Sequence, residues 1–269
     1  MTDSASGPLA GVRIVELAGI GPAPFACMLL ADLGAEVVRV ERRATRRVVQ
    51  DPTLRSRRSI ALDLKHAAAR EALLRLVATS DALVEGFRPG VAERLGIGPD
   101  DCLARNPRLV YGRITGWGQD GPLARTAGHD INYIALAGLL HQVGRRGEGP
   151  VPPLNLAGDY GGGGMLLALG MVAALFERER SGRGQVIDAA MLDGAIALLA
   201  AIIGFREQGV WRDATGENFL SGAAHFYGTY RTRDGHWMAV GAIESQFYAI
   251  LLDRLGLDPQ EFAPGVGLG

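Results

Sequence analysis

Short apolar segments typical of strands alternate with segments of helical spacing in the amino-terminal part of this chain, and this alternation constrains its fold most. Residues 12–17 are rich in β-branched side chains and are flanked by glycines, whereas residues 22–33 have helical spacing with proline in the first turn. The same alternation predicts further strands at 37–40, 59–64, 82–85 and 109–114, and helices at 67–78 and after Pro89. It indicates an α/β fold with a doubly wound parallel sheet.

The middle of the chain is expected to be mostly helical. Residues 160–180 have the pattern of one long helix, and residues 189–208 have that of a second. We expect a domain change near Arg183. This gives a large domain over residues 1–183, and a connecting helix with a smaller, partial α+β domain over residues 184–269.

A β-hairpin is expected near the end of the chain. Two strand-like segments, 226–232 and 237–240, flank the dipeptide Asp234-Gly235. Asp-Gly between two such segments is a strong signal for a tight hairpin turn.

Composition and charge exclude several classes of protein. With 269 residues, of which 48% are hydrophobic, the chain can bury a sizeable core. Its net charge of -1 gives no overall field that would attract nucleic acid or a membrane. Cys27 and Cys102 form no CxxC pattern, and neither a leader segment nor a long apolar run is visible. We therefore expect a cytoplasmic protein that neither binds nucleic acid nor inserts into a membrane.

The segment Gly19-Ile20-Gly21-Pro22-Ala23-Pro24 imitates a dinucleotide-binding fingerprint, with Glu41 about twenty residues further on. Pro24 stands where the third glycine would permit close packing, and Pro22 removes an amide donor that a pyrophosphate would need. A structural turn between strand and helix is therefore favoured over a nicotinamide site.

A dense set of arginines follows Glu41, with Asp51 as the one acidic residue among them. Such a loop could neutralise a ligand with several phosphates, although spacing alone favours a solvated connection. Arg88 follows a predicted strand, either as a ligand contact at the carboxyl edge of the sheet or as an ordinary surface arginine. The arginines of the loop are Arg42, Arg43, Arg46, Arg47, Arg55, Arg57 and Arg58.

His129 and Asp159 are the candidate proton-transfer residues. From spacing alone, His129 at the start of a helical pattern is more often a cap than a catalyst, yet a helix amino terminus would keep its imidazole neutral near pH 7. Asp159 precedes the four glycines 161–164, which cost a helix about 1 kcal/mol each relative to alanine. We therefore expect bare N–H groups here to face a ligand oxygen, and Asp159 to be functional rather than an N-cap.

Several motifs carry a resemblance to a known family. They are Gly128-His129-Asp130-Ile131-Asn132-Tyr133, Pro153-Leu154-Asn155-Leu156 with Asp159, Gly184-Gln185-Val186-Ile187-Asp188-Ala189, and Val240-Gly241-Ala242-Ile243-Glu244 with Gln246-Phe247-Tyr248. By these motifs the chain resembles the alpha-methylacyl-CoA racemases of the family III CoA transferase superfamily. The resemblance implies a Rossmann-like large domain, a small domain, and a homodimer of two interlocked chains.

The resemblance also implies roles for individual residues. His129 and Asp159 would be the two proton-transfer residues, and Glu244 would hydrogen-bond His129 and orient it. The residues that would hold CoA are Arg42, Ala61, Leu62, Asp63, Leu64, Arg88, Gly128, Asp130, Ile131, Asn132 and Tyr133. The implied reaction of fatty acid metabolism inverts the α-carbon of a 2-methylacyl-CoA thioester through an enolate. CoA is part of that substrate, and no metal or separate cofactor is implied.

Two other functions stay open at this point. One is CoA transfer with Asp159 as nucleophile, which His129 disfavours because that chemistry needs no opposing base. The other is a CoA-binding fragment without catalysis. The segment Leu220-Ser221-Gly222-Ala223-Ala224-His225 departs from the racemase pattern, and this predicts altered substrate choice or weaker activity. Because racemases are longer than this chain, we expect a truncated product with an unfinished small domain.

Overall fold

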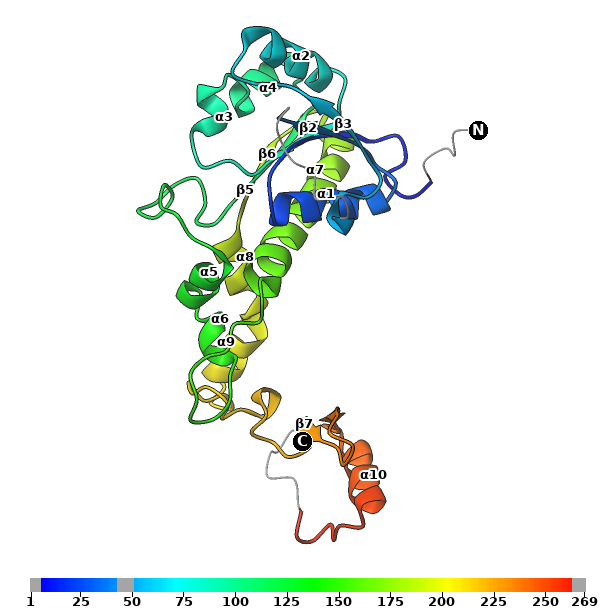
Figure 1. Cartoon of the computed structure of the whole chain (residues 1–269), viewed down its shortest axis with the longest axis vertical. Helices are drawn as coiled ribbons and strands as arrows, with labels where there is room; N and C mark the ends of the chain where they lie inside the picture. The colour runs from blue at the N-terminus through cyan, green and yellow to red at the C-terminus, as the bar shows by residue number, and fades with distance from the viewer. Residues whose placement is uncertain (1–5, 43–50, 263–269) are drawn as a thin grey trace. The chain divides into compact units, whose positions relative to one another are not determined.

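The structure is a computed structural model that describes residues 6–42 and 51–262 (Figure 1). Its contacts divide the chain into two units. Unit 1 comprises residues 1–137 and 154–198, and unit 2 comprises residues 138–153 and 199–269.

A parallel sheet of six strands forms the centre of unit 1, with strand order β3-β2-β1-β4-β5-β6. The strands are β1 (Arg13–Leu17), β2 (Glu36–Glu41), β3 (Arg57–Ala61), β4 (Ala82–Glu85), β5 (Val110–Thr115) and β6 (Val186–Ala190). This order is that of the doubly wound Rossmann fold, so the predicted α/β class is confirmed. The order reverses between β1 and β4, and sheets of this kind bind ligands beyond the carboxyl ends of the strands at that point.

Helices cover both faces of this sheet. Successive strand residues point to opposite faces, and since both sets are apolar, each face is buried by helices. Ile14 packs with α1 and α7, whereas the next residue, Val15, packs with α2 and α4. Both side chains are fully buried. The helices are α1 (Pro22–Asp32), α2 (Ala67–Val77), α3 (Val91–Arg94), α4 (Pro99–Arg105), α5 (Asp130–Leu136), α7 (Leu166–Ser181) and α8 (Met191–Leu198), with a short 3-10 turn η1 (Pro52–Leu54).

The carboxyl-terminal border of unit 1 differs from the expected domain change near Arg183. Strand β6 follows Arg183 and pairs with β5 in parallel, from Tyr111 opposite Val186 to Thr115 opposite Ala190. The expected helix over residues 189–208 is therefore replaced by β6, α8 and α9 (Ala200–Glu207). At the opposite edge of the sheet, β3 ends earlier than the expected strand 59–64.

A π-helix, η2 (Leu156–Met165), stands where the expected long helix begins, and α7 continues from it. Residues 156–181 are long and apolar enough to cross a membrane by length and composition alone. In unit 1 this stretch packs against the sheet, with Leu167 and Met171 fully buried.

The glycines of η2 permit close packing against neighbouring helices. A Cβ atom on Gly162 would lie 2.7 Å from the amide nitrogen of Ala195 in α8, and one on Gly164 would lie 3.0 Å from the carbonyl oxygen of Pro22 in α1. On the other side of the contact, a Cβ atom on Gly194 would lie 1.7 Å from the carbonyl oxygen of Gly162. Gly162, Gly164 and Gly194 thus meet protein backbone, which gives them a structural reason. That the N–H groups of the four glycines face a ligand oxygen stays a prediction.

Gly194→Ala is expected to destabilise unit 1, because rigid backbone on both sides leaves no room for the added methyl group. Overpacking of this kind costs about 1–3 kcal/mol or more in free energy of unfolding. Gly204→Ala is the matched control, since Gly204 also lies in a helix but a Cβ atom there would meet nothing within 4 Å. The control should gain up to about 1 kcal/mol. Equal effects of the two substitutions in urea unfolding would contradict the packing explanation.

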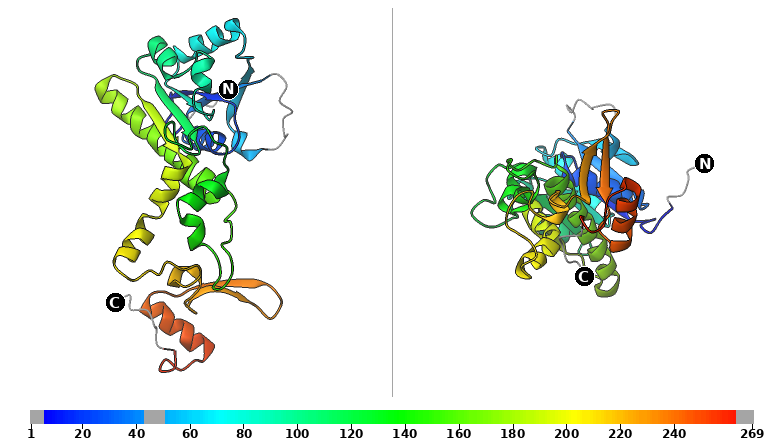
Figure 2. Two further views of the ribbon diagram at one scale, coloured as in Figure 1. Left: turned by 90° about the vertical axis from the view of Figure 1, so that its left-hand side faces the viewer. Right: turned by 90° about the horizontal axis from the view of Figure 1, so that it is seen from below.

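Unit 2 contains the predicted hairpin. Strands β7 (Tyr227–Arg231) and β8 (Trp237–Gly241) pair antiparallel, and Gly235 at the turn has a φ of 86°. The remaining elements are α6 (Leu139–Gln142), α9, η3 (Phe219–Ser221) and α10 (Ser245–Leu255). The hairpin and α10 lie side by side (Figure 2), and Phe226 packs against Tyr248 and Leu252. His225, in the segment that departs from the racemase pattern, has its Nε2 atom 2.7 Å from the Tyr248 hydroxyl.

Candidate active site

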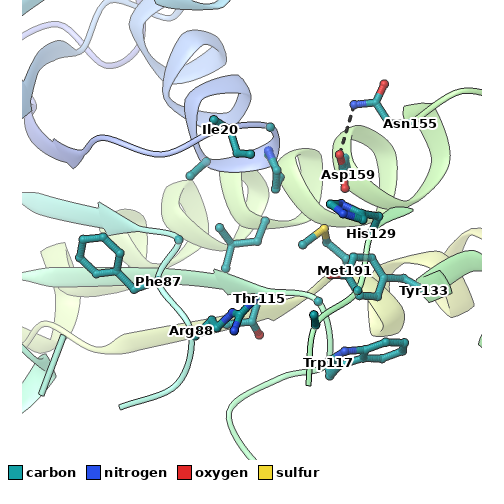
Figure 3. Close-up of a pocket in the computed structure, with 18 of the residues that line it drawn as sticks. Ile20, Phe87, Arg88, Thr115, Trp117, His129, Tyr133, Asn155, Asp159 and Met191 are labelled. Carbon is teal, nitrogen blue, oxygen red and sulfur yellow. Dashed lines mark hydrogen bonds between the residues drawn. The ribbon is translucent and has the colours of Figure 1, made fainter. Parts of the chain in front are cut away.

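A cavity of about 460 Å³ opens in unit 1 at the carboxyl ends of the central strands (Figure 3). Its walls come from the turn after β1, the segment 86–89 after β4, and the segment 115–117 at the end of β5. His129 and Asp159 also line it. Its position matches the reversal of strand order, and its volume lies within the roughly 300–1,000 Å³ of small-molecule sites.

His129 occupies the N-cap position of α5 through its main chain alone. Its carbonyl oxygen accepts the N–H of Asn132 at 2.8 Å, and its own N–H donates to the Asn132 Oδ1 atom at 3.0 Å. The imidazole makes no capping hydrogen bond and lines the cavity. Main-chain capping therefore leaves the ring available for proton transfer.

Asp159 lies in the first turn of η2, half-buried, beside His129 (Figure 3). Asn155 donates a hydrogen bond from Nδ2 to the Asp159 Oδ2 atom at 3.2 Å. Burial raises the pKa of Asp159 and the nearby Asp130 carboxylate raises it further, whereas Asn155 and His129 act in the opposite direction. The protonated acid is therefore more accessible near neutral pH than it would be in an exposed aspartate.

The Asp130 carboxylate is bound by the protein's own backbone. It is 5% exposed, and its Oδ2 atom accepts the N–H groups of Gly158 at 2.6 Å and Asp159 at 2.7 Å. These two amides precede the glycines 161–164, whose N–H groups we expect to face a ligand oxygen. Asp130 joins the start of α5 to the start of η2, and so fixes His129 and Asp159 relative to each other.

The residues predicted to hold CoA fall into two groups. Arg88, Gly128 and Tyr133 line the cavity together with His129 and Asp159. The others do not line it: Ile131 and Asn132 are exposed on α5, while Ala61, Leu62, Asp63 and Leu64 lie at and just beyond the end of edge strand β3. Arg42 is the last residue described before the gap.

Three arginines of the predicted cationic loop are engaged in ion pairs. Arg55 pairs with Asp32, Arg57 with Glu16, and Arg58 with Glu36. Their charges are thus matched within the sheet and α1, which supports a structural role for this part of the loop. Arg43, Arg46 and Arg47 lie outside the described residues.

Sequence reasoning missed several residues that line the cavity. Asn155, the hydrogen-bond partner of Asp159, is one of them. Gly21 is another: its φ is 71°, and a Cβ atom there would lie 3.5 Å from the Asp159 Oδ2 atom. Its segment follows β1 at the reversal of strand order, and that position was the available signal. The turn that imitates a dinucleotide fingerprint therefore forms one lip of the site.

Glu244, the third predicted catalytic residue, belongs to unit 2. It is exposed and occupies the N-cap position of α10. Its hydrogen bond to His129 stays a prediction.

Asn155→Ala is expected to move the pKa of Asp159 further upward, because it removes the side-chain hydrogen bond that favours the ionised carboxylate. Carbon-detected NMR titration of the Asp159 carboxyl group measures this directly. Asn106→Ala is a matched control, since the Asn106 amide donates to the carbonyl oxygens of Val77 and Ser80 instead. An Asp159 titration that responds equally to both substitutions would rule out the local hydrogen bond as the cause.

Comparisons with known proteins place this site in context. Residues 9–264 match the family model described as CoA-transferase family III. The mouse protein named alpha-methylacyl-CoA racemase is 53% identical over 94% of this chain and 66% of its own length. The human protein of that name is 50% identical over the same shares. The chain thus spans 66% of the length of these curated relatives. A crystal structure of a CAIB/BAIF family protein from Brucella suis superposes with a TM-score of 0.81 at 28% identity, over 96% of this chain and 73% of that one.

Proposed function

The chain belongs to CoA-transferase family III, and on this basis we propose that it interconverts the two epimers of 2-methylacyl-CoA thioesters by two-base proton transfer. One observation carries the proposal: an imidazole and a carboxyl group, His129 and Asp159, line a single cavity at the ligand-binding edge of the sheet. The sequence identity of 50–53% to two proteins named alpha-methylacyl-CoA racemase, over 94% of this chain, supports it.

The proposed reaction uses the two groups in opposite senses. The hydrogen on the branched carbon of a thioester is weakly acidic, so a base must remove it and an acid must return one to the other face. From one epimer, neutral His129 abstracts the proton while protonated Asp159 donates; from the other epimer, the roles are exchanged. The pair must therefore hold one proton between them, and its titration belongs to both groups together. The upward shift in the pKa of Asp159 favours this shared state.

The surroundings of the pair suit an acyl-CoA. Arg88 brings a cation to the cavity that could contact a phosphate or the pantetheine end of the ligand. Ile20, Ile114 and Met191 give the cavity apolar surface for an alkyl chain. No separate cofactor enters the proposal, because CoA is itself part of the substrate.

The remaining expectations are also proposals. We propose that Glu244 hydrogen-bonds and orients His129, that two chains interlock as a homodimer, and that the protein acts in the cytoplasm. Arg42 and the segment from Ala61 to Leu64 would contact CoA at the edge of the sheet, separately from the cavity.

Deuterium uptake tests the proposal. Incubation of a single epimer of a 2-methylacyl-CoA in heavy water should give deuterium at the α-carbon and both epimers in the product. CoA transfer, the reaction for which the family is named, would instead load an acyl group or CoA onto Asp159, and hydroxylamine would trap that intermediate. Binding of CoA with neither exchange nor trapping would indicate a non-catalytic protein and would overturn the proposed reaction.

A further inference from the structure

Three charged side chains form a cluster next to the cavity without lining it. They are Glu85 at the end of β4, Arg113 on β5 and Glu93 on α3. The Arg113 Nε atom lies 3.2 Å from the Glu85 Oε1 atom, and its Nη1 atom lies 2.9 Å from the Glu93 Oε1 atom. Glu85 is fully buried and Arg113 is 6% exposed. Burial of a charge costs desolvation free energy even when the charge is paired, so a pair of this kind is weak evidence for stability and suggests another role.

The cluster holds the segment that carries Arg88. The second carboxylate oxygen of Glu85, Oε2, accepts the backbone N–H of Phe87 at 2.6 Å. Phe87, Arg88 and Pro89 then form one wall of the cavity. Glu85 thus bonds to the wall through Oε2 and to Arg113 through Oε1. Arg113 in turn pairs with Glu93 of α3.

Arg88 itself is not anchored by its side chain. Within the described part of the chain its guanidinium makes no hydrogen bond and no ion pair, although it lines the cavity. Its place in the cavity is therefore set by the main chain of its own segment, which is the part that Glu85 holds.

We propose that the Glu85–Arg113–Glu93 cluster positions Arg88 for an anionic group of the ligand. The proposal rests on the proposed function for the identity of that ligand, CoA. Glu85 and Arg113 are positioning residues, which act on the ligand through Arg88 and do not contact it. An arginine that is held by its backbone loses less freedom when it pairs with an anion, and this favours binding.

A double-mutant cycle tests whether the cluster acts through Arg88. Glu85→Gln keeps an acceptor for the Phe87 N–H but removes the charge that pairs with Arg113, and it is expected to raise the Kd for CoA by roughly 3- to 30-fold. In the Arg88→Ala background the same substitution should change the Kd by less than about twofold, since the group that the cluster positions is gone. Equal effects in both backgrounds would overturn the proposal.

Amide hydrogen exchange tests the same role without any ligand. Glu93→Gln leaves the hydrogen bond between Glu85 and Phe87 in place. It should nevertheless speed exchange of the Phe87 and Arg88 amides, because it weakens the ion pair that holds Arg113 beside Glu85. Glu71→Gln is the matched control, because Glu71 is similarly exposed and pairs with an arginine elsewhere, Arg105. Unchanged exchange at Phe87 and Arg88 in both Glu93→Gln and Glu85→Gln would overturn the proposal. A parent protein that fails to bind CoA would count against the proposed function instead.

The dependence on pH gives a third readout. Burial raises the pKa of Glu85 to about 7, against the opposing effects of the Phe87 N–H and Arg113, while Glu93 also raises it. Asp188 on β6 faces the same guanidinium from the other side. Protonated Glu85 resembles glutamine, so the Kd values for CoA of the parent and Glu85→Gln should differ most above this pKa and converge below it. A ratio of Kd values that stays constant through this range would overturn the proposal.

Discussion

Replacement of His129 by glutamine or of Asp159 by asparagine is expected to slow epimer interconversion by about 10²- to 10⁴-fold, the usual contribution of a positioned acid or base. Inversion needs both groups in either direction, so each substitution should slow it by a similar factor for both epimers. Exchange should separate the two roles. His129→Gln should still permit slow hydrogen exchange, without inversion, of the epimer that Asp159 deprotonates. Asp159→Asn should permit it for the epimer that His129 deprotonates. Chiral analysis combined with mass spectrometry of the recovered thioester measures both quantities.

A second histidine–aspartate pair serves as the control for this experiment. His236 and Asp234 lie 3.3 Å apart at the exposed turn of the hairpin in unit 2. His236→Gln and Asp234→Asn make the same chemical changes on exposed residues, and both variants should keep the parent rate. Full inversion by either His129→Gln or Asp159→Asn would remove the two-base mechanism from consideration.

Glu16→Ala is expected to lower the free energy of unfolding by about 3–5 kcal/mol, the usual cost of breaking a buried ion pair from one side. Glu16 is fully buried on β1 and pairs with Arg39 of β2 and Arg57 of β3. Its removal takes the Glu16 carboxylate from the buried guanidinium of Arg57 and leaves Arg39 paired with Glu41 alone, at 3.1 Å between Nε and Oε1. Arg39 also donates to the carbonyl oxygen of Gly19 at 3.2 Å, so the turn that forms one lip of the cavity should loosen as well.

The matched control for this prediction is Glu36→Ala. Glu36 also pairs with two arginines, Arg13 and Arg58, but its side chain is 35% exposed. Water screens such pairs, and the loss in stability should stay below about 1 kcal/mol. Urea unfolding of the two variants compares them directly. Similar losses would show that burial does not determine the strength of the Glu16 cluster.

Local patterns predicted most of the sheet, because buried parallel strands and amphipathic helices differ in period and length. Strand β6 was missed since its residues, Val186 to Ala190, run directly into the helix-forming residues of α8. Its extended form comes from pairing with β5, a contact with residues far away in the sequence. The glycines of η2 show the same limit. Their cost to a helix is visible in the sequence, whereas the backbone of α8 and α1 that requires them is not.

The candidate site was predictable in its chemistry but less so in its geometry. His129 and Asp159 carry the residue types that proton transfer needs, and they line one cavity. The sequence could not show that Asp130 turns towards the amides of η2, because that contact joins two segments about thirty residues apart. Charge alone was also misleading in the arginine-rich loop, where Arg57 forms an ion pair with Glu16.

The π-helical form of η2 limits how much the length of this segment can vary. Each N–H group of a π-helix donates to the carbonyl group five residues earlier, whereas in an α-helix it donates to the one four residues earlier. The loss of one residue would therefore favour the α-helix, which is the narrower form. Each residue of an α-helix turns the chain by roughly 100°. A single deletion among Gly161 to Gly164 would therefore rotate Asp159 away from the imidazole while α7 stayed anchored to the sheet. Natural or engineered variants should accept length changes in surface loops, but at this point the number of residues is itself part of the geometry that brings His129 and Asp159 to one cavity.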